Sequence, residues 1–147
     1  MMNTKIYTHV HSLAEELMVA VQKKDQVRFD KSYQELKQVC DDNDNTDKDH
    51  PVQWETLADF TDDLELAITI YDKALTKAQE INSKDFLSSI AYSTALLKLE
   101  LGEKDSAIEY LEKAKVSSNK IVDKELKAEI HDLLMDLKDQ ETVNESE

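Results

Sequence analysis

Apolar residues recur every three or four positions along almost the whole chain, which is the spacing of one face of an α-helix. The segment at residues 86–99 is apolar on several sides, so we expect it to lie between neighbouring helices. The turn signals and alternating patterns of a β-protein are missing. The pattern therefore predicts an all-α fold. Its helical blocks cover residues 4–40, 50–82, 84–118 and 121–139.

Two segments lack the helical pattern. Residues 41–49 hold five aspartates and no apolar side chain, which predicts a solvated, flexible acidic linker. A calcium loop does not fit there, because Thr46 stands where such a loop needs glycine and Val52 where it needs glutamate. Residues 140–147 carry three glutamates and one sizeable apolar residue, so we expect a disordered acidic tail. The rest, residues 1–139, has the length of a single domain.

An internal repeat is visible in the second helix of two predicted pairs. The segment 67–74 (AITIYDKA) lies 40 residues before 107–114 (AIEYLEKA), and four of the eight positions are identical. Alanines at this spacing let two antiparallel helices approach closely, while a bulky residue fills the gap beside the contact. Phe29, Tyr33 and Leu36 repeat the spacing 38 residues earlier with larger side chains.

The stretch 101–114 (LGEKDSAIEYLEKA) resembles the inter-helix turn and second helix of the tetratricopeptide repeat family. The period of 38–40 residues is similar to the subtype with repeats of about 40 residues. The resemblance implies an α-solenoid of three antiparallel helix pairs, at about 4–40, 50–82 and 84–118, closed by a capping helix at 121–139. A plain amphipathic helical bundle is the alternative that the pattern leaves open.

The chain is strongly acidic. It has 32 acidic and 18 basic residues in 147, a net charge of -14, and residues 41–65 alone hold ten acids and one lysine. Such a surface repels phosphates, and Arg28 is the only arginine, so we expect no nucleic-acid partner. A basic or neutral protein is the natural complement.

Few residues offer chemistry. A single glycine and a single cysteine exclude a glycine-rich phosphate loop and a cysteine zinc site. Cys40 stands beside Asp41 and Asp42, which disfavour its thiolate. His11 and Glu15 share one helix face, but two ligands make at most a weak metal site. We therefore expect a protein that is not an enzyme and has no metal or cofactor.

The resemblance implies a concave groove lined by the first helix of each pair. In the third pair, the phase set by Gly102 places Ser89, Tyr92, Ser93 and Leu96 on that face. In the first pair it places His11, Ala14 and Met18 there. A core position for Tyr92 remains the alternative.

The leading hypothesis is a module that binds a peptide or helix of another protein in this groove. The alternatives are a small acidic chaperone for a secreted or toxic client, similar to those of type III secretion, and a structural protein that pairs with a second copy. The apolar runs are too short for a membrane span, and residues 1–21 do not read as a secretory signal. With one cysteine, the simplest location is the cytoplasm.

Overall fold

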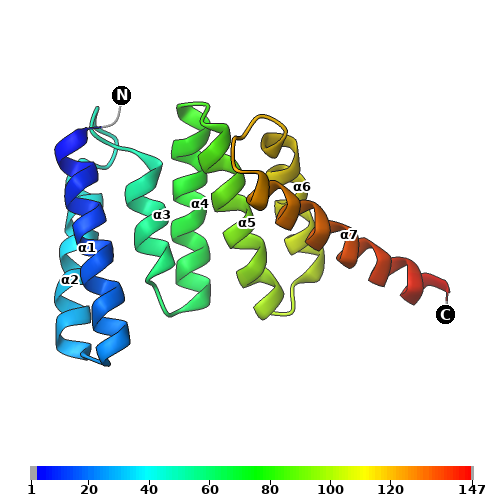
Figure 1. The fold of residues 1–147 in the computed structure, drawn as a ribbon, viewed down its shortest axis with the longest axis horizontal. Helices are drawn as coiled ribbons and strands as arrows, with labels where there is room; N and C mark the ends of the chain where they lie inside the picture. The colour runs from blue at the N-terminus through cyan, green and yellow to red at the C-terminus, as the bar shows by residue number, and fades with distance from the viewer. Residues whose placement is uncertain (1–2, 147) are drawn as a thin grey trace. The chain divides into compact units, whose positions relative to one another are not determined.

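The computed structural model describes the backbone of residues 3–146 and the side chains of residues 3–140. Within this range the chain forms seven α-helices and no strand, which confirms the all-α prediction (Figure 1). The chain divides into two compact units, Met1–Lys77 and Ala78–Glu147, and the boundary falls inside one helix. Each unit is described separately below.

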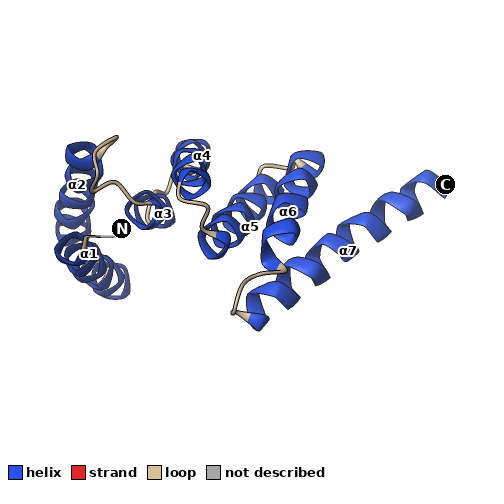
Figure 2. Ribbon diagram, turned by 90° about the horizontal axis from the view of Figure 1, so that it is seen from above, coloured by secondary structure: helices blue, strands red, loops and turns tan. Residues whose placement is uncertain are grey.

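The first unit contains three complete helices and most of a fourth. Helices α1 and α2 pack side by side, and α3 contacts both of them (Figures 1 and 2). The bounds are α1 Thr4–Lys23, α2 Gln26–Asn43, α3 Pro51–Asp59 and α4 Leu64–Glu80. The predicted apolar stripes form the interior, with Val10, Leu13, Leu17, Leu36 and Trp54 among the buried side chains.

The turn between α1 and α2 follows from its polar sequence. Lys24 adopts a left-handed conformation with φ +55°, and the next amide closes the end of α1 on the Ala20 carbonyl at 2.9 Å. The Asp25 carboxylate then accepts a hydrogen bond from the Arg28 amide at 3.1 Å and caps α2. This short connection brings the C-terminus of α1 next to the N-terminus of α2, where the candidate site lies.

The acidic segment differs from the predicted linker. Helix α2 continues to Asn43, which corrects the expected linker start at residue 41. The remaining residues form turns, and the Asp49 carboxylate accepts a hydrogen bond from the Asn45 amide at 2.8 Å. The aspartates at both ends of this turn are bound to lysines of α4, as described below. The segment is therefore tied to the fold at Asp44 and Asp49.

The second unit contains α5 Lys84–Glu100, α6 Lys104–Ser118 and α7 Lys124–Ser146. Helices α5 and α6 pack together, and α7 packs on α6. The repeat alanines Ala107 and Ala114 are fully buried, as close helix packing requires. Gly102 has φ +75° between α5 and α6, which confirms its predicted role at a helix end.

The last helix covers the interior of the second unit with a shorter stripe than expected. Ile130, Leu134 and Leu137 are buried, and the two leucines join the cluster around Leu111 of α6. The predicted helix at 121–139 includes Val122, but this residue lies before α7 and is 87% exposed. The helix also continues to Ser146, which corrects the expected disorder from residue 140, while Glu147 lies outside the described residues.

Candidate functional site

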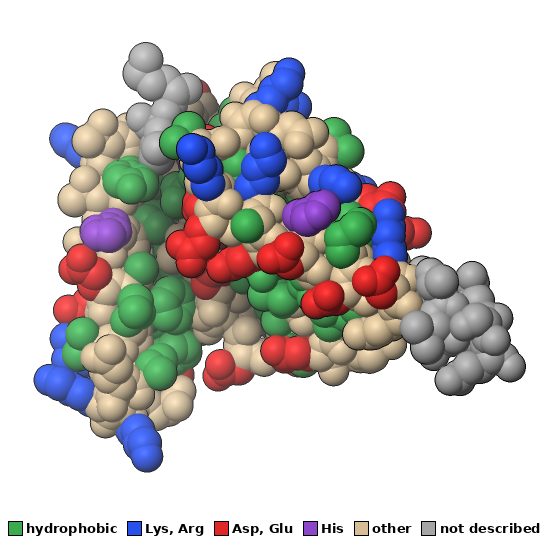
Figure 3. All heavy atoms as spheres, turned by 45° about the vertical axis from the view of Figure 1, so that its right-hand side comes forward, with side chains coloured by type: hydrophobic (Ala, Val, Ile, Leu, Met, Phe, Trp, Pro, Cys, Tyr) green, Lys and Arg blue, Asp and Glu red, His purple; other side chains and the backbone are tan. Residues whose placement is uncertain are grey.

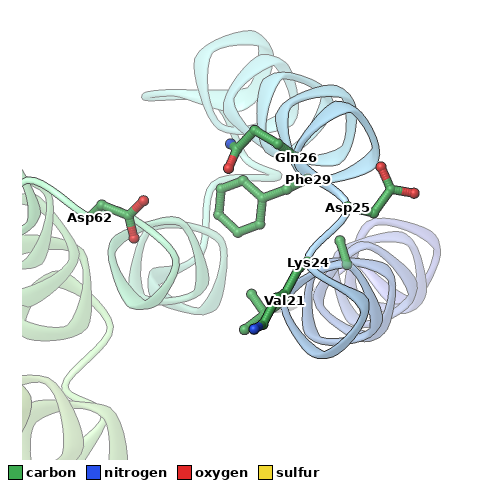
Figure 4. A pocket seen from close by; sticks show the side chains of 7 residues that line it. Val21, Lys24, Asp25, Gln26, Phe29 and Asp62 are labelled. Atoms are coloured by element: carbon green, nitrogen blue, oxygen red, sulfur yellow. The ribbon is translucent and has the colours of Figure 1, made fainter.

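A hollow of about 280 Å³ lies at the turn between α1 and α2 (Figure 4). The Phe29 ring points into it from α2, Val21 and Lys24 approach from the end of α1, and Asp62 faces them from the α3–α4 connection. The hollow therefore combines an aromatic surface with charged edges. Its complete lining is Ala20, Val21, Lys24, Asp25, Gln26, Phe29 and Asp62.

A second hollow of about 300 Å³ adjoins the first and shares three lining residues, Gln26, Phe29 and Asp62. It continues along α2 toward the loop between α3 and α4. The residues added by this hollow are Asp30, Tyr33, Gln34, Phe60, Thr61, Asp63 and Leu66. We call the two hollows together the α2 groove.

A hydrogen bond joins the two walls of the α2 groove to each other. The Tyr33 hydroxyl of α2 lies 2.8 Å from the Thr61 hydroxyl, which itself donates to the Leu57 carbonyl at 2.7 Å. Thr61 has one proton, so Tyr33 is the donor in the first bond. The Asp63 carboxylate accepts from the Leu66 amide at 2.9 Å and caps α4.

The edge of the α2 groove is acidic. Its lining holds four aspartates, Asp25, Asp30, Asp62 and Asp63, and one lysine, for a net charge of -3. Among the ion pairs found in the described residues, none includes any of these four carboxylates. Asp30 accepts a hydrogen bond from Gln26 at 2.7 Å, and Asp25 and Asp63 cap helices. The groove can therefore attract a cation without first breaking an ion pair.

A charged cluster elsewhere in the first unit holds the acidic turn in place. Lys77 Nζ lies 2.7 Å from Asp49, 3.1 Å from Asp44 and 2.8 Å from the Asn45 side-chain carbonyl. Lys73 lies 2.6 Å from Asp44 and 4.1 Å from the centre of the Trp54 ring. Burial alone would lower the pKa of Lys77, but its hydrogen bonds with Asp49 and Asp44 raise it. The hydrogen bond from Lys73 lowers the pKa of Asp44. These mutual contacts make the cluster a structural clamp.

Two further groups that could carry chemistry are both engaged. Cys40 is buried, its thiol donates to the Gln53 carbonyl at 3.3 Å, and burial raises its pKa to about 12. Such a thiol is a poor nucleophile at neutral pH. His50 caps α3, with Nδ1 accepting from the Val52 amide at 3.1 Å, and burial lowers its pKa. Both side chains therefore make contacts that hold the first unit together.

The described residues contain no group of three histidine, cysteine, aspartate or glutamate side chains close enough together to hold a metal ion. A search of the same residues for a helix that is long and apolar enough to cross a bilayer finds none.

The structure places the predicted binding residues of the first unit on the surface of α1. His11 and Met18 are exposed and Ala14 is half-buried, and Tyr7 and Val21 continue the same line in both directions. The Tyr7 and His11 rings stack with centroids 6.4 Å apart. Val21 also lines the first hollow, so this line of side chains leads into the α2 groove. We call Tyr7, His11, Ala14, Met18 and Val21 the α1 stripe.

The predicted binding residues of the second unit are less open. Tyr92 is partly buried and packs against the cluster formed by α5, α6 and α7. Burial and the Glu129 carboxylate of α7 raise its pKa. Ser89 and Ser93 are half-buried, and only Leu96 is exposed, at 39%. The proposal below therefore rests on the first unit.

Sequence reasoning missed the α2 groove. Phe29 and Tyr33 were assigned to a core stripe, yet both are half-buried and line the second hollow. Asp62 and Asp63 belong to the segment 41–65, which the sequence marks only as strongly acidic. The available signal was a pair of α2 aromatics next to an acidic loop, but no short sequence pattern brings residues 29 and 62 together.

Comparisons of the chain with protein-family models, with curated proteins and with solved structures find no match.

Proposed function

We propose that this protein is a non-enzymatic interaction module that binds a segment of another protein. The observation that carries the proposal is the α2 groove, in which Phe29, Tyr33, Phe60 and Leu66 lie among aspartates that form no ion pair within the described residues. Aromatic side chains give large contact area at a small entropic cost, and acidic edges steer and orient a partner. The openness of the groove suits a protein segment better than a small molecule enclosed by its site.

A tetratricopeptide-like arrangement of helix pairs is part of the same proposal. The buried alanines at residues 67, 74, 107 and 114 and the left-handed Gly102 support it, because close pairing of short-looped helices needs both. In such an arrangement, binding residues are carried on rigid helices and their position depends little on loop motion.

Photo-crosslinking in the native cell tests the proposal. A benzophenone amino acid replaces Gln34, which lines the second hollow and is exposed. The matched control carries the same group at Asp132, an exposed position of α7. We expect discrete crosslinked partners from position 34 that are absent from position 132 and are lost when Leu66→Ser is added. The same bands from both positions, or bands that persist in Leu66→Ser, would contradict the proposal.

A further inference from the structure

The α1 stripe and the α2 groove meet at Val21 on the first unit. Met18 is 55% exposed and Val21 is 58% exposed, and Val21 belongs to both features. In Figure 3, hydrophobic side chains gather on the N-terminal part of the molecule, at the left of the view. Exposed apolar side chains that gather on one face are typical of surfaces that bind another molecule.

The spacing of side chains along the α1 stripe favours a ligand in a helical conformation. Its residues follow one another at intervals of four, three, four and three, so they lie on one narrow face of α1. From Tyr7 to Val21 this face is about 21 Å long at 1.5 Å per residue. A second helix can lay its own apolar face along such a ridge and fill the spaces between its side chains.

Backbone hydrogen bonding favours the same form. An extended peptide needs partners for its amides and carbonyls, and the described part of the chain has no strand edge to supply them. The backbone of α1 is already paired within the helix. A helical ligand satisfies its own backbone groups, so it can bind an all-helical surface through side chains alone.

The negative charge of the α2 groove favours a ligand with basic residues beside its apolar anchor. Asp30, Asp62 and Asp63 lie beside Phe29 and Leu66 and form no ion pair within the described residues. Lysine or arginine next to an apolar anchor would meet these carboxylates while the anchor contacts the ring. Acidic or uncharged segments would lose this attraction.

We propose that the surface from the α1 stripe to the α2 groove receives an amphipathic, cationic helix of a partner protein. This inference rests on the proposed function and names the chemistry of its ligand. The apolar face of the helix lies on Met18 and Val21, and its basic residues meet Asp30, Asp62 and Asp63.

A peptide panel of defined charge tests the inference. Three labelled peptides of about 18 residues, enough to cover the ~21 Å stripe, are titrated by fluorescence anisotropy. The first combines leucine and phenylalanine at helical spacing with lysine, the second replaces lysine with glutamate, and the third replaces the apolar residues with serine. We expect only the first to bind tightly, with an affinity that falls as salt rises. The carbon chemical shifts of the first peptide, labelled with carbon-13 and measured by NMR in the complex, check that the bound peptide is helical.

Matched variants separate groove contacts from overall charge. Asp30→Asn/Asp62→Asn/Asp63→Asn should weaken binding roughly tenfold, since three favourable pairs are lost. The control Asp132→Asn/Asp136→Asn/Asp139→Asn makes the same charge change on exposed α7 positions and should change binding less than about twofold. Met18→Ser, compared with Val116→Ser, tests the apolar face without touching the core, since Met18 and Val116 are both exposed.

The outcomes that would overturn this inference can be told apart from those that would overturn the proposed function. Equal binding of the glutamate peptide, an extended bound peptide, equal effects of the two aspartate variants, or no binding by any peptide would overturn the inference. The crosslinks from position 34 would still support the proposed function in those cases. If sedimentation shows a dimer that Met18→Ser dissociates, the occupant is a second copy of this chain and the cationic-partner inference is wrong.

Discussion

Lys77 Nζ lies 2.7 Å from the Asp49 carboxylate, and each of the two side chains exposes only 7% of its surface. The pair joins α4 to a turn that follows α2, across 28 residues of sequence. An isolated carboxylate or ammonium at this depth would be costly, so each charge depends on the other. The acidic turn is held against α4 where Asp44 and Asp49 pair with Lys73 and Lys77.

Lys77→Met is therefore expected to destabilise the first unit strongly. The substitution keeps most of the apolar stem but leaves Asp49 buried without its cation, at a cost of about 3–5 kcal/mol. Urea unfolding followed by the fluorescence of Trp54, the only tryptophan, measures it in this unit. The control is Arg28→Met, which breaks a more exposed pair with Glu16 in the same unit and should cost less than about 1 kcal/mol. Equal costs for the two variants would refute the clamp.

The stability of the first unit should fall as the pH falls from 7 to 5. Burial lowers the pKa of His50 in the folded chain, whereas an unfolded histidine binds its proton near pH 6.5. Below that pH the unfolded state holds more protons, and protonation favours unfolding. His50→Asn replaces the Nδ1 acceptor with a side-chain oxygen that can cap α3 and cannot titrate, so the stability of this variant should depend less on pH in this window. His11→Asn, an exposed histidine on α1, controls for the loss of a histidine, and an equal effect would contradict this role.

Tyr92→Ala is expected to act on stability rather than on binding. Tyr92 is partly buried against the α5–α6–α7 cluster, so the change should cost about 2 kcal/mol, less than the 3–5 kcal/mol typical of fully buried aromatics. Leu96→Ala, on the same helix and more exposed, should cost less than about 1 kcal/mol. Thermal unfolding by circular dichroism checks both variants. An unchanged melting point with lost partner binding would return Tyr92 to the role of binding anchor.

Leu134→Ala tests whether α7 is part of the second unit. Leu134 is fully buried in the cluster with Leu111. Its truncation should therefore lower the free energy of unfolding by about 2–5 kcal/mol, because contacts are lost and a cavity is left behind. Val122→Ala makes a similar change at a residue that is 87% exposed and should stay within about 0.5 kcal/mol. If both variants unfold like the wild type, α7 is an accessory arm and not a cover.

The helices could be predicted because their signals are local. Alanines at matched phase, the left-handed glycine after α5 and the apolar stripes all act within a few turns of the residue concerned, and the structure buries Ala67, Ala74, Ala107 and Ala114 as expected. The prediction that Val122 belongs to the last helix was wrong, because periodicity does not show where a helix begins. Helix α7 starts two residues later, at Lys124.

The acidic turn and the groove could not be predicted for the opposite reason. Composition marks residues 44–49 as solvated, and only the fold shows that Lys77 reaches Asp49. Phe29 carries the spacing of a core residue, and its exposure depends on where the α3–α4 connection passes. Both features arise from contacts between residues that are far apart in the sequence, and local sequence patterns do not show such contacts.

Amide NMR of the full chain with the lysine-containing amphipathic peptide tests the central claim most directly, because it locates the ligand. The account predicts shift changes concentrated in residues 7–34 and 60–66, together with loss of these changes in Asp30→Asn/Asp62→Asn/Asp63→Asn. Shift changes spread over the acidic surface of both units, or concentrated in α5–α7, would contradict it.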